Sequence, residues 1–219
     1  AWQERYQGER NAHKIALLEG GLKWQATGMS QRDMDFIAGM KLNEDNPVVS
    51  AFAEAYTRII IYPSRSLASI TDPETLKKEE QRSRVINLAS MRALDRVRKE
   101  GNAVLVFPSG TRYRPGKPET KKGVREIDSY IRLSDVMLLV SINGNCLRFS
   151  DDPHDMLGDV VCSDRIVMCA SPVIDCTAFR EEARKWAGDG IEDKKQMVVD
   201  YVMHRLDLMH EENEAGRLS

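Results

Sequence analysis

Residues 103–110 read Ala103-Val104-Leu105-Val106-Phe107-Pro108-Ser109-Gly110. An apolar run followed at once by proline, serine and glycine is typical of a strand that is buried on both faces and ends in a tight turn. Strands of this kind belong to α/β proteins, in which helices cover both faces of the sheet. This stretch therefore predicts an α/β fold with a polar turn at the end of one strand.

A long helix is predicted just before this strand. Asp72 suits its N-cap, Pro73 its first helical position, and Gly101 its end. Between them, apolar residues form one stripe at helical spacing: Val85, Leu88, Met91, Leu94 and Val97. Because the apolar run 58–62 precedes the helix, the three elements predict a right-handed crossover between two parallel strands.

Similar patterns continue along the chain. Further apolar runs are predicted as strands at 35–38, 137–142 and 165–169. Further helices are predicted at 47–56, 123–133, 178–186 and 192–212. The apolar stripe of the last helix consists of Met197, Val198, Tyr201, Val202, Leu206 and Met209. We therefore expect a mixed, mostly parallel sheet flanked by helices, in one domain over residues 1–219.

Composition limits the class of protein. The chain has 219 residues, with 32 Lys and Arg against 34 Asp and Glu, so its formal net charge is -2. A near-neutral balance argues against general binding to nucleic acid. No apolar run approaches the roughly 18 residues that a membrane-spanning helix needs. The four cysteines form no Cys-x-x-Cys pair, which predicts reduced thiols, no zinc site and a cytoplasmic location.

Two arginines follow the turn after the strand 103–107. Ligands of α/β proteins collect beyond the carboxyl ends of strands, where Arg112 and Arg114 are expected. Two guanidinium groups can hold one phosphate through charged, bidentate hydrogen bonds, and Gly110 lets the backbone approach it closely. The alternative is an ordinary polar turn whose arginines are solvated or pair with Glu119 or Glu126.

A third arginine occupies a similar position. Arg65 follows the apolar run 58–62, so it lies near Arg112 and Arg114 if the two strands are neighbours. Three arginines around one pocket favour a phosphate ester over a carboxylate. The alternative for Arg65 is a solvated loop charge.

The segment around Arg112 and Arg114 resembles a block found in a known family. Phe107-Pro108-Ser109-Gly110-Thr111-Arg112-Tyr113-Arg114-Pro115 is similar to the arginine block of glycerolipid acyltransferases, usually Phe-Pro-Glu-Gly-Thr-Arg-Ser-Arg. Ser109 stands in place of the glutamate, and this Pro-Ser-Gly form is typical of the soluble, chloroplast-type glycerol-3-phosphate acyltransferases. Weaker similarities to that branch lie at 35–39, 61–66 and 134–136, in the same order and at similar spacings.

The resemblance implies an activity in phospholipid biosynthesis. An acyl group passes from acyl carrier protein or acyl-CoA to the sn-1 hydroxyl of glycerol 3-phosphate, with no metal or other cofactor. Arg65, Arg112 and Arg114 would hold the phosphate, and Ser66 stands where the family often has a histidine. The substrate-binding residues that the resemblance implies are Arg65, Ser66, Ser109, Gly110, Thr111, Arg112 and Arg114. Because the product enters the bilayer, peripheral contact with a membrane is compatible with the expected cytoplasmic location.

The catalytic motif of the family is not visible ahead of the run 35–38, where the family has it. Those enzymes use His-x-x-x-x-Asp, in which the histidine takes the proton of the hydroxyl and the aspartate orients the ring. Of the four histidines, only His154 has an aspartate five positions later, Asp159, and this pair follows the arginine block, whereas the motif of the family precedes it. His13, at a similar distance before Phe36, has only Glu19 nearby. We expect the motif upstream of Ala1, in a truncated chain, or separated from Asp35 by an insertion.

Several alternatives stay open. His13 can serve as the base without its carboxylate. The protein can instead be a lysophosphatidate acyltransferase, which shares the arginine block, or a catalytically inactive homologue that binds a phosphate or a lipid. A nucleotide-binding Rossmann protein is disfavoured, because the chain has neither a Gly-x-Gly-x-x-Gly motif nor a phosphate-binding loop motif.

Overall fold

The computed structural model describes residues 34–39, 58–62, 66–67, 70–114, 116–149 and 159–218. These residues fall into two compact units, one that ends at Gly110 and one that begins at Thr111. Each unit is described by itself, and the expectation of a single domain stays a prediction. The helix predicted at 47–56 lies outside the described residues. No helix in the described part of the chain is both long and apolar enough to span a membrane.

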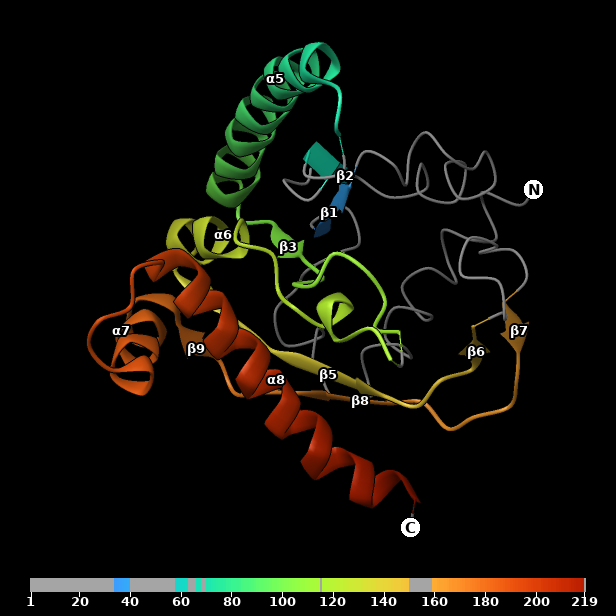
Figure 1. Cartoon of the computed structure of the whole chain (residues 1–219). Coiled ribbons are helices and arrows are strands. Elements are labelled where there is room, and N and C mark those ends of the chain that lie inside the picture. The colour runs from blue at the N-terminus through green and yellow to red at the C-terminus, as the bar shows by residue number, and fades with distance from the viewer. Residues whose placement is uncertain are drawn as a thin grey trace, which may run out of the picture. The chain divides into compact units, whose positions relative to one another are not determined.

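The first unit is built on a small parallel sheet (Figure 1). Its strands are β1 (Met34–Gly39), β2 (Arg58–Ile61) and β3 (Ala103–Leu105), in the spatial order β2-β1-β3. The helix α5 (Pro73–Lys99) connects β2 to β3 and packs on both strands. A helix thus links two parallel strands, as the sequence predicts, and β3 ends two residues before its predicted boundary.

The ends of α5 follow the local sequence signals. Asp72 is its N-cap, and the Asp72 Oδ2 atom accepts a hydrogen bond from the backbone N–H of Thr75 at 2.8 Å. Pro73 lies in the first turn, where its missing N–H removes no helical hydrogen bond. After Lys99, Gly101 adopts a φ of +81°, which glycine reaches without a steric penalty. Both predicted helix ends are confirmed.

The buried face of α5 differs from the predicted apolar stripe. Val85 and Leu88 are 70% and 55% exposed, whereas Ser90 is buried together with Leu94 and Val97. The stripe is therefore right for Leu94 and Val97 and wrong for Val85 and Leu88.

Polar contacts with the end of β2 explain the difference. The Asn87 Oδ1 atom accepts a hydrogen bond from the Tyr62 N–H at 2.8 Å, and Asn87 Nδ2 donates to the Tyr62 carbonyl oxygen at 3.0 Å. The Ser90 hydroxyl donates to the carbonyl oxygen of Ile60. Backbone groups that are buried without a partner carry a cost. The helix therefore turns its polar side chains toward the strand and leaves neighbouring apolar ones outside.

The second unit combines short antiparallel ladders with helices (Figure 1). Its described helices are α6 (Ile127–Leu133), α7 (Cys176–Ala187) and α8 (Lys194–Leu218), with a 3₁₀ turn, η3 (Pro118–Thr120). Its strands are β4 (Val136–Met137), β5 (Val140–Asn143), β6 (Leu147–Arg148), β7 (Val160–Val161), β8 (Val167–Ala170) and β9 (Ile174–Asp175). The ladders pair β4 with β9, β5 with β8 and β6 with β7.

The α/β class is confirmed, but the mostly parallel sheet is wrong for the described ladders. Only β1, β2 and β3 run parallel, while the strands of the second unit pair antiparallel in twos. The prediction treated the apolar runs 137–142 and 165–169 as strands buried on both faces. Leu138, Ile142 and Ile166 are exposed, however, so these runs bury one face only, as antiparallel sheets commonly do.

The core of the second unit lies where α7 packs on α8 and α8 crosses β5 (Figure 1). Phe179 and Ala183 of α7 are buried, and the ring centroid of Phe179 lies 4.8 Å from that of Tyr201. The stripe predicted for the last helix faces this core: its buried members are Met197, Val198, Tyr201 and Val202. Burial is confirmed for these four residues, whereas Leu206 and Met209 are only partly buried. The helix α8 also extends beyond the predicted end at 212.

Hydrogen bonds among polar side chains connect the C-terminal part of α8 to β5. Asn143 is fully buried, and its Nδ2 atom donates to the backbone oxygen of His210 at 2.8 Å and to Glu214 Oε2 at 2.9 Å. Arg217 Nε donates to both Glu214 oxygens, and Arg217 Nη1 donates to Asp164 Oδ1 at 2.6 Å. The hydrogen bonds from Arg217, and then the one from Asn143, lower the pKa of Glu214 to about 2.

We expect Glu214→Gln to destabilise the protein near neutral pH and to lose this effect in acid. The unfolded pKa of glutamate is about 4.3. Because the folded value is lower, the carboxylate stabilises the fold above that pH, and this contribution disappears as the pH falls toward about 2. Urea unfolding of both proteins from neutral pH downward measures the difference in free energy. A difference that stays constant with pH, or that equals the effect of Glu211→Gln on the exposed side of the helix, would contradict this role.

Candidate functional site

The polar turn predicted after β3 is present. The Gly110 N–H donates to the carbonyl oxygen of Phe107 at 2.9 Å, which closes a turn over Pro108 and Ser109. Gly110 has a φ of +62°, so a side chain at this position would strain the turn. The conformation of the turn alone therefore explains why this residue is a glycine, whether or not a ligand binds there.

The predicted site residues divide between the two units. Those of the first unit are Ser66, Ser109 and Gly110. Those of the second unit are Thr111, Arg112 and Arg114. His13 and Arg65 lie outside the described residues. That all of them share one site stays a prediction.

Arg112 is held by three partners around the β6–β7 ladder. Its Nη1 atom donates to the carbonyl oxygen of Leu147 at 3.2 Å, and its Nη2 atom donates to Asp159 Oδ2 at 2.5 Å. Its guanidinium carbon lies 3.8 Å from the centroid of the Phe149 ring, well within cation–π range. Among the described residues, Arg112 thus pairs with Asp159, and not with Glu119 or Glu126.

Arg114 approaches the same ring from the end of a tight turn. Its guanidinium carbon lies 5.1 Å from the Phe149 centroid. The Lys117 N–H donates to the Arg114 carbonyl oxygen at 3.0 Å, and the Arg114 N–H donates to Thr120 Oγ1 at 2.9 Å. Gly116 lies inside this turn with a φ of +81°. The turn fixes the backbone of Arg114, and Phe149 gives both arginines a common contact.

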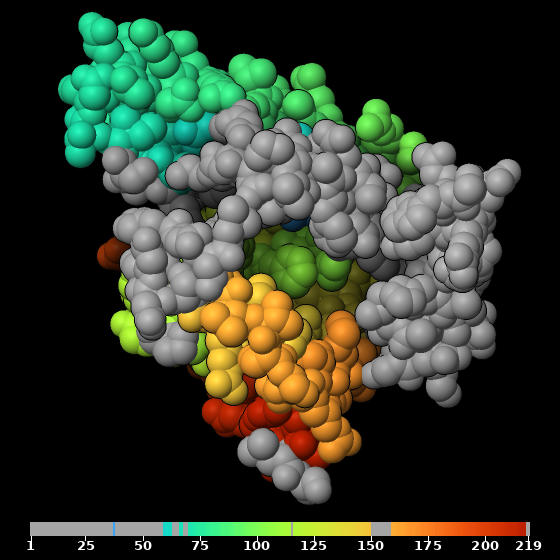
Figure 2. All heavy atoms as spheres, turned by 90° about the vertical axis from the view of Figure 1, so that its right-hand side faces the viewer, coloured from blue at the N-terminus to red at the C-terminus, as the bar shows by residue number. Residues whose placement is uncertain are grey.

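We call Arg112, Arg114 and Phe149 the arginine cluster. The ladder that carries Phe149 lies at the surface of the face in Figure 2, where β6 is gold and β7 is orange. Val160 and Val161 of β7 are exposed, and Arg112 keeps 40% of its side chain exposed. Two guanidinium groups beside one ring can together hold a dianion such as a phosphate monoester if both turn to the same side of it.

Asp159 occupies one edge of Arg112 and would compete with such a ligand. Its side chain is only 12% exposed. Arg112 keeps 40% of its side chain exposed, so the pair is partly screened by solvent and contributes on the order of 1 kcal/mol. A phosphate that also engages Arg114 can therefore displace it from Arg112.

We expect Asp159→Asn to strengthen the binding of inorganic phosphate or glycerol 3-phosphate roughly 2- to 5-fold, which corresponds to about 0.5–1 kcal/mol for the lost ion pair. Titration calorimetry measures the affinity. Asp189→Asn removes the same charge from an exposed position between α7 and α8 and should leave the affinity unchanged. Equal gains in both variants would mean that only net charge matters, and no gain would show that Asp159 does not compete.

Sequence reasoning missed Phe149 and Asp159. Both lie more than 30 residues beyond the arginine block. Phe149 directly follows β6 and Asp159 directly precedes β7, so both lie at the same end of the β6–β7 ladder. Neither residue belongs to a motif, and only the pairing of β6 with β7 brings them to Arg112. A contact between residues this far apart along the chain cannot be recognised from a single sequence.

Among the described residues, no group of three or more His, Cys, Asp or Glu side chains is placed to hold a metal ion. A scan against models of known protein families finds no match for this chain, and a search of curated proteins finds none either. The class of protein is therefore inferred from the arginine block and from the contacts of the arginine cluster.

Proposed function

We propose that the protein is an acyltransferase that moves a fatty acyl group from acyl carrier protein or acyl-CoA to the sn-1 hydroxyl of glycerol 3-phosphate. The observation that carries the proposal is the position of Arg112 and Arg114 against one ring, Phe149, within a segment that resembles the arginine block of these enzymes. Two guanidinium groups so placed suit a phosphate monoester better than a single carboxylate.

In this proposal the arginine cluster binds the phosphate and does no chemistry on it. Arg112 Nη2 exchanges the Asp159 oxygen for a phosphate oxygen, while its Nη1 atom keeps the bond to the Leu147 carbonyl. Phe149 limits the rotation of both guanidinium groups, so less entropy is lost when the ligand binds. Arg65, Ser66, Ser109, Gly110 and Thr111 complete the proposed binding set.

The proposed reaction is a thioester acyl transfer. The sn-1 hydroxyl oxygen attacks the thioester carbonyl carbon, and a base takes the hydroxyl proton. The tetrahedral intermediate collapses, the carbon–sulfur bond breaks, and the thiolate leaves with the electron pair and then takes up a proton. The products are an sn-1 ester and a free thiol. Within this chain His13 is the candidate base, and a His-x-x-x-x-Asp pair encoded upstream would be the other source.

The proposal includes a cytoplasmic location with peripheral contact to the membrane that receives the product. The acyl donor is acyl carrier protein or acyl-CoA, and nucleic acid is not a proposed partner. The near alternative, a lysophosphatidate acyltransferase, differs in the acceptor and shares the arginine block.

An acyl-transfer assay with radiolabelled glycerol 3-phosphate tests the proposal. It is run on this chain and on the protein expressed from its full reading frame, with acyl-CoA and acyl carrier protein as donors. Label in lysophosphatidate is the expected result. A parallel assay supplies lysophosphatidate as the acceptor, and transfer to it but not to glycerol 3-phosphate would favour the near alternative. Phosphate binding without transfer in either protein would favour a catalytically inactive homologue.

A further inference from the structure

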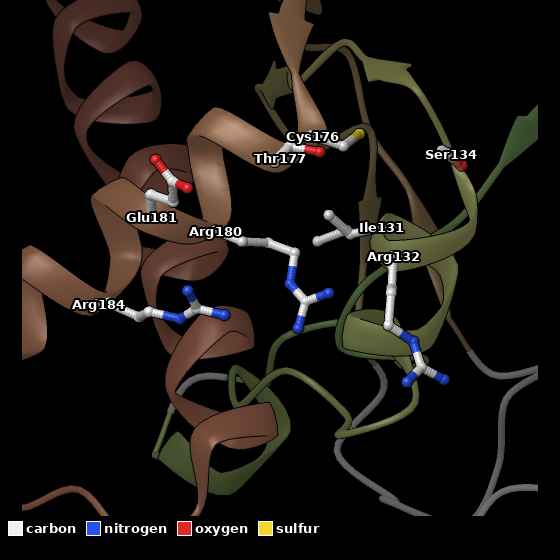
Figure 3. A pocket seen from close by; sticks show the side chains of 8 residues that line it. All are labelled: Ile131, Arg132, Ser134, Cys176, Thr177, Arg180, Glu181 and Arg184. Atoms are coloured by element: carbon white, nitrogen blue, oxygen red, sulfur yellow. The ribbon is translucent and has the colours of Figure 1, made fainter.

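A pocket between α6 and α7 carries three arginines. It has a volume of about 160 Å³ and lies within the second unit. Arg132 comes from the end of α6, and Arg180 and Arg184 lie one turn apart on α7, on the same side of that helix. In Figure 3 the Arg184 side chain extends toward Arg180, and Arg132 enters from α6 on the other side.

The positive charge of this pocket is only partly neutralised. Arg180 Nη2 lies 3.1 Å from Oδ1 of Asp128, a carboxylate that is almost wholly buried. The Arg180 Nε atom is buried and has no hydrogen-bond partner in the described part of the chain. Arg132 and Arg184 form no ion pair with any described residue. Glu181 also lines the pocket, but its carboxylate points away from the guanidinium groups (Figure 3).

The lining thiol is not suited to covalent chemistry. Burial, with smaller contributions from Asp175 and Asp135, raises the pKa of Cys176 to about 11. The thiol is therefore protonated near neutral pH and is a poor nucleophile. Thr177 adds an exposed hydroxyl group to the lining. The described lining thus offers groups that bind an anion and no activated nucleophile.

We propose that this pocket binds the phosphate or diphosphate group of a soluble small molecule. Guanidinium groups form charged, bidentate hydrogen bonds with phosphate oxygens. The volume of about 160 Å³ is many times the roughly 10–15 Å³ that a single water occupies. The buried Asp128 holds Arg180 in place, while Arg132 and Arg184 are free of ion pairs among the described residues and can turn to the ligand. The pocket shares no residue with the arginine cluster, so this site does not depend on the proposed acyltransferase function.

Titration of the ¹⁵N-labelled chain with inorganic pyrophosphate and with inorganic phosphate tests the site. The Nε–Hε signals of Arg132, Arg180 and Arg184 are followed, since they report on this pocket alone. We expect these three signals to shift together and to saturate. Arg184→Gln should weaken the affinity roughly tenfold, the low end of the loss for a charged hydrogen bond. Arg112→Gln should leave it unchanged, which separates this site from the arginine cluster.

Lys185→Gln is the matched control, because it removes one charge from the same helix at a position that does not line the pocket. It should leave the affinity unchanged. Signals that shift without saturating, or an equal loss in Lys185→Gln and Arg184→Gln, would overturn the proposal, since either result indicates general attraction of anions. Vesicles that contain phosphatidate test the other source of a phosphate group. Saturation by vesicles without any response to pyrophosphate would overturn the assignment to a soluble ligand.

Discussion

Arg112→Ala is expected to weaken the binding of glycerol 3-phosphate roughly 10- to 150-fold, which corresponds to about 1.5–3 kcal/mol for a lost charged hydrogen bond. Arg114→Ala should have an effect in the same range. Both guanidinium groups contact Phe149, and in the proposed complex both hold one phosphate. Because they share a ligand, the double variant should lose less than the sum of the two single losses. Titration calorimetry of the three variants measures these differences.

Arg148→Ala is the matched control for these variants. Arg148 is exposed in β6 between Leu147 and Phe149, and the alternation of side chains along a strand places it on the opposite face of the ladder. Its replacement removes the same charge a few ångströms from the cluster and should leave the affinity unchanged. Unchanged affinity in both Arg112→Ala and Arg114→Ala would remove the phosphate site from this loop.

Phe179→Ala is expected to lower the free energy of unfolding by about 3–5 kcal/mol, the usual cost of removing a buried aromatic ring. Phe179 is 1% exposed, and its ring centroid lies 4.8 Å from that of Tyr201, so the packing of α7 on α8 cannot readily fill the space. A loss of this size is a large part of the total stability of a typical domain, about 5–15 kcal/mol. Urea unfolding followed by circular dichroism measures it.

Val173→Ala provides the comparison for Phe179→Ala, because Val173 is exposed just before β9. Its replacement should change the stability by no more than about 0.5 kcal/mol. A loss below about 1.5 kcal/mol for Phe179→Ala would contradict the position of the core described here.

Local signals in the sequence predict the helices better than they predict packing. The ends of α5 follow from Asp72, Pro73 and Gly101, because each acts on its own backbone and needs no distant partner. The buried face of α5 cannot be predicted from such local signals, since it depends on the hydrogen bonds that Asn87 and Ser90 make with the end of β2. The pairing of the strands in the second unit is hidden for a similar reason: an apolar run does not reveal which of its residues is exposed.

In the candidate site, too, the sequence predicts the local features and not the long-range contacts. The arginine block shows that Arg112 and Arg114 follow a turn at the end of a strand, and the turn is present. The partners that hold Arg112, Phe149 and Asp159, come from a ladder far along the chain and depend on the fold. Three arginines of α6 and α7 meet in a pocket that no motif marks.

A crystal structure of the protein soaked with glycerol 3-phosphate tests the central claim most directly. We expect the phosphate to lie within hydrogen-bond distance of the guanidinium groups of both Arg112 and Arg114, with Asp159 displaced from Arg112 Nη2. A structure in which the ligand is absent, or lies elsewhere while Arg112 still pairs with Asp159, would contradict the claim that the arginine cluster holds the phosphate.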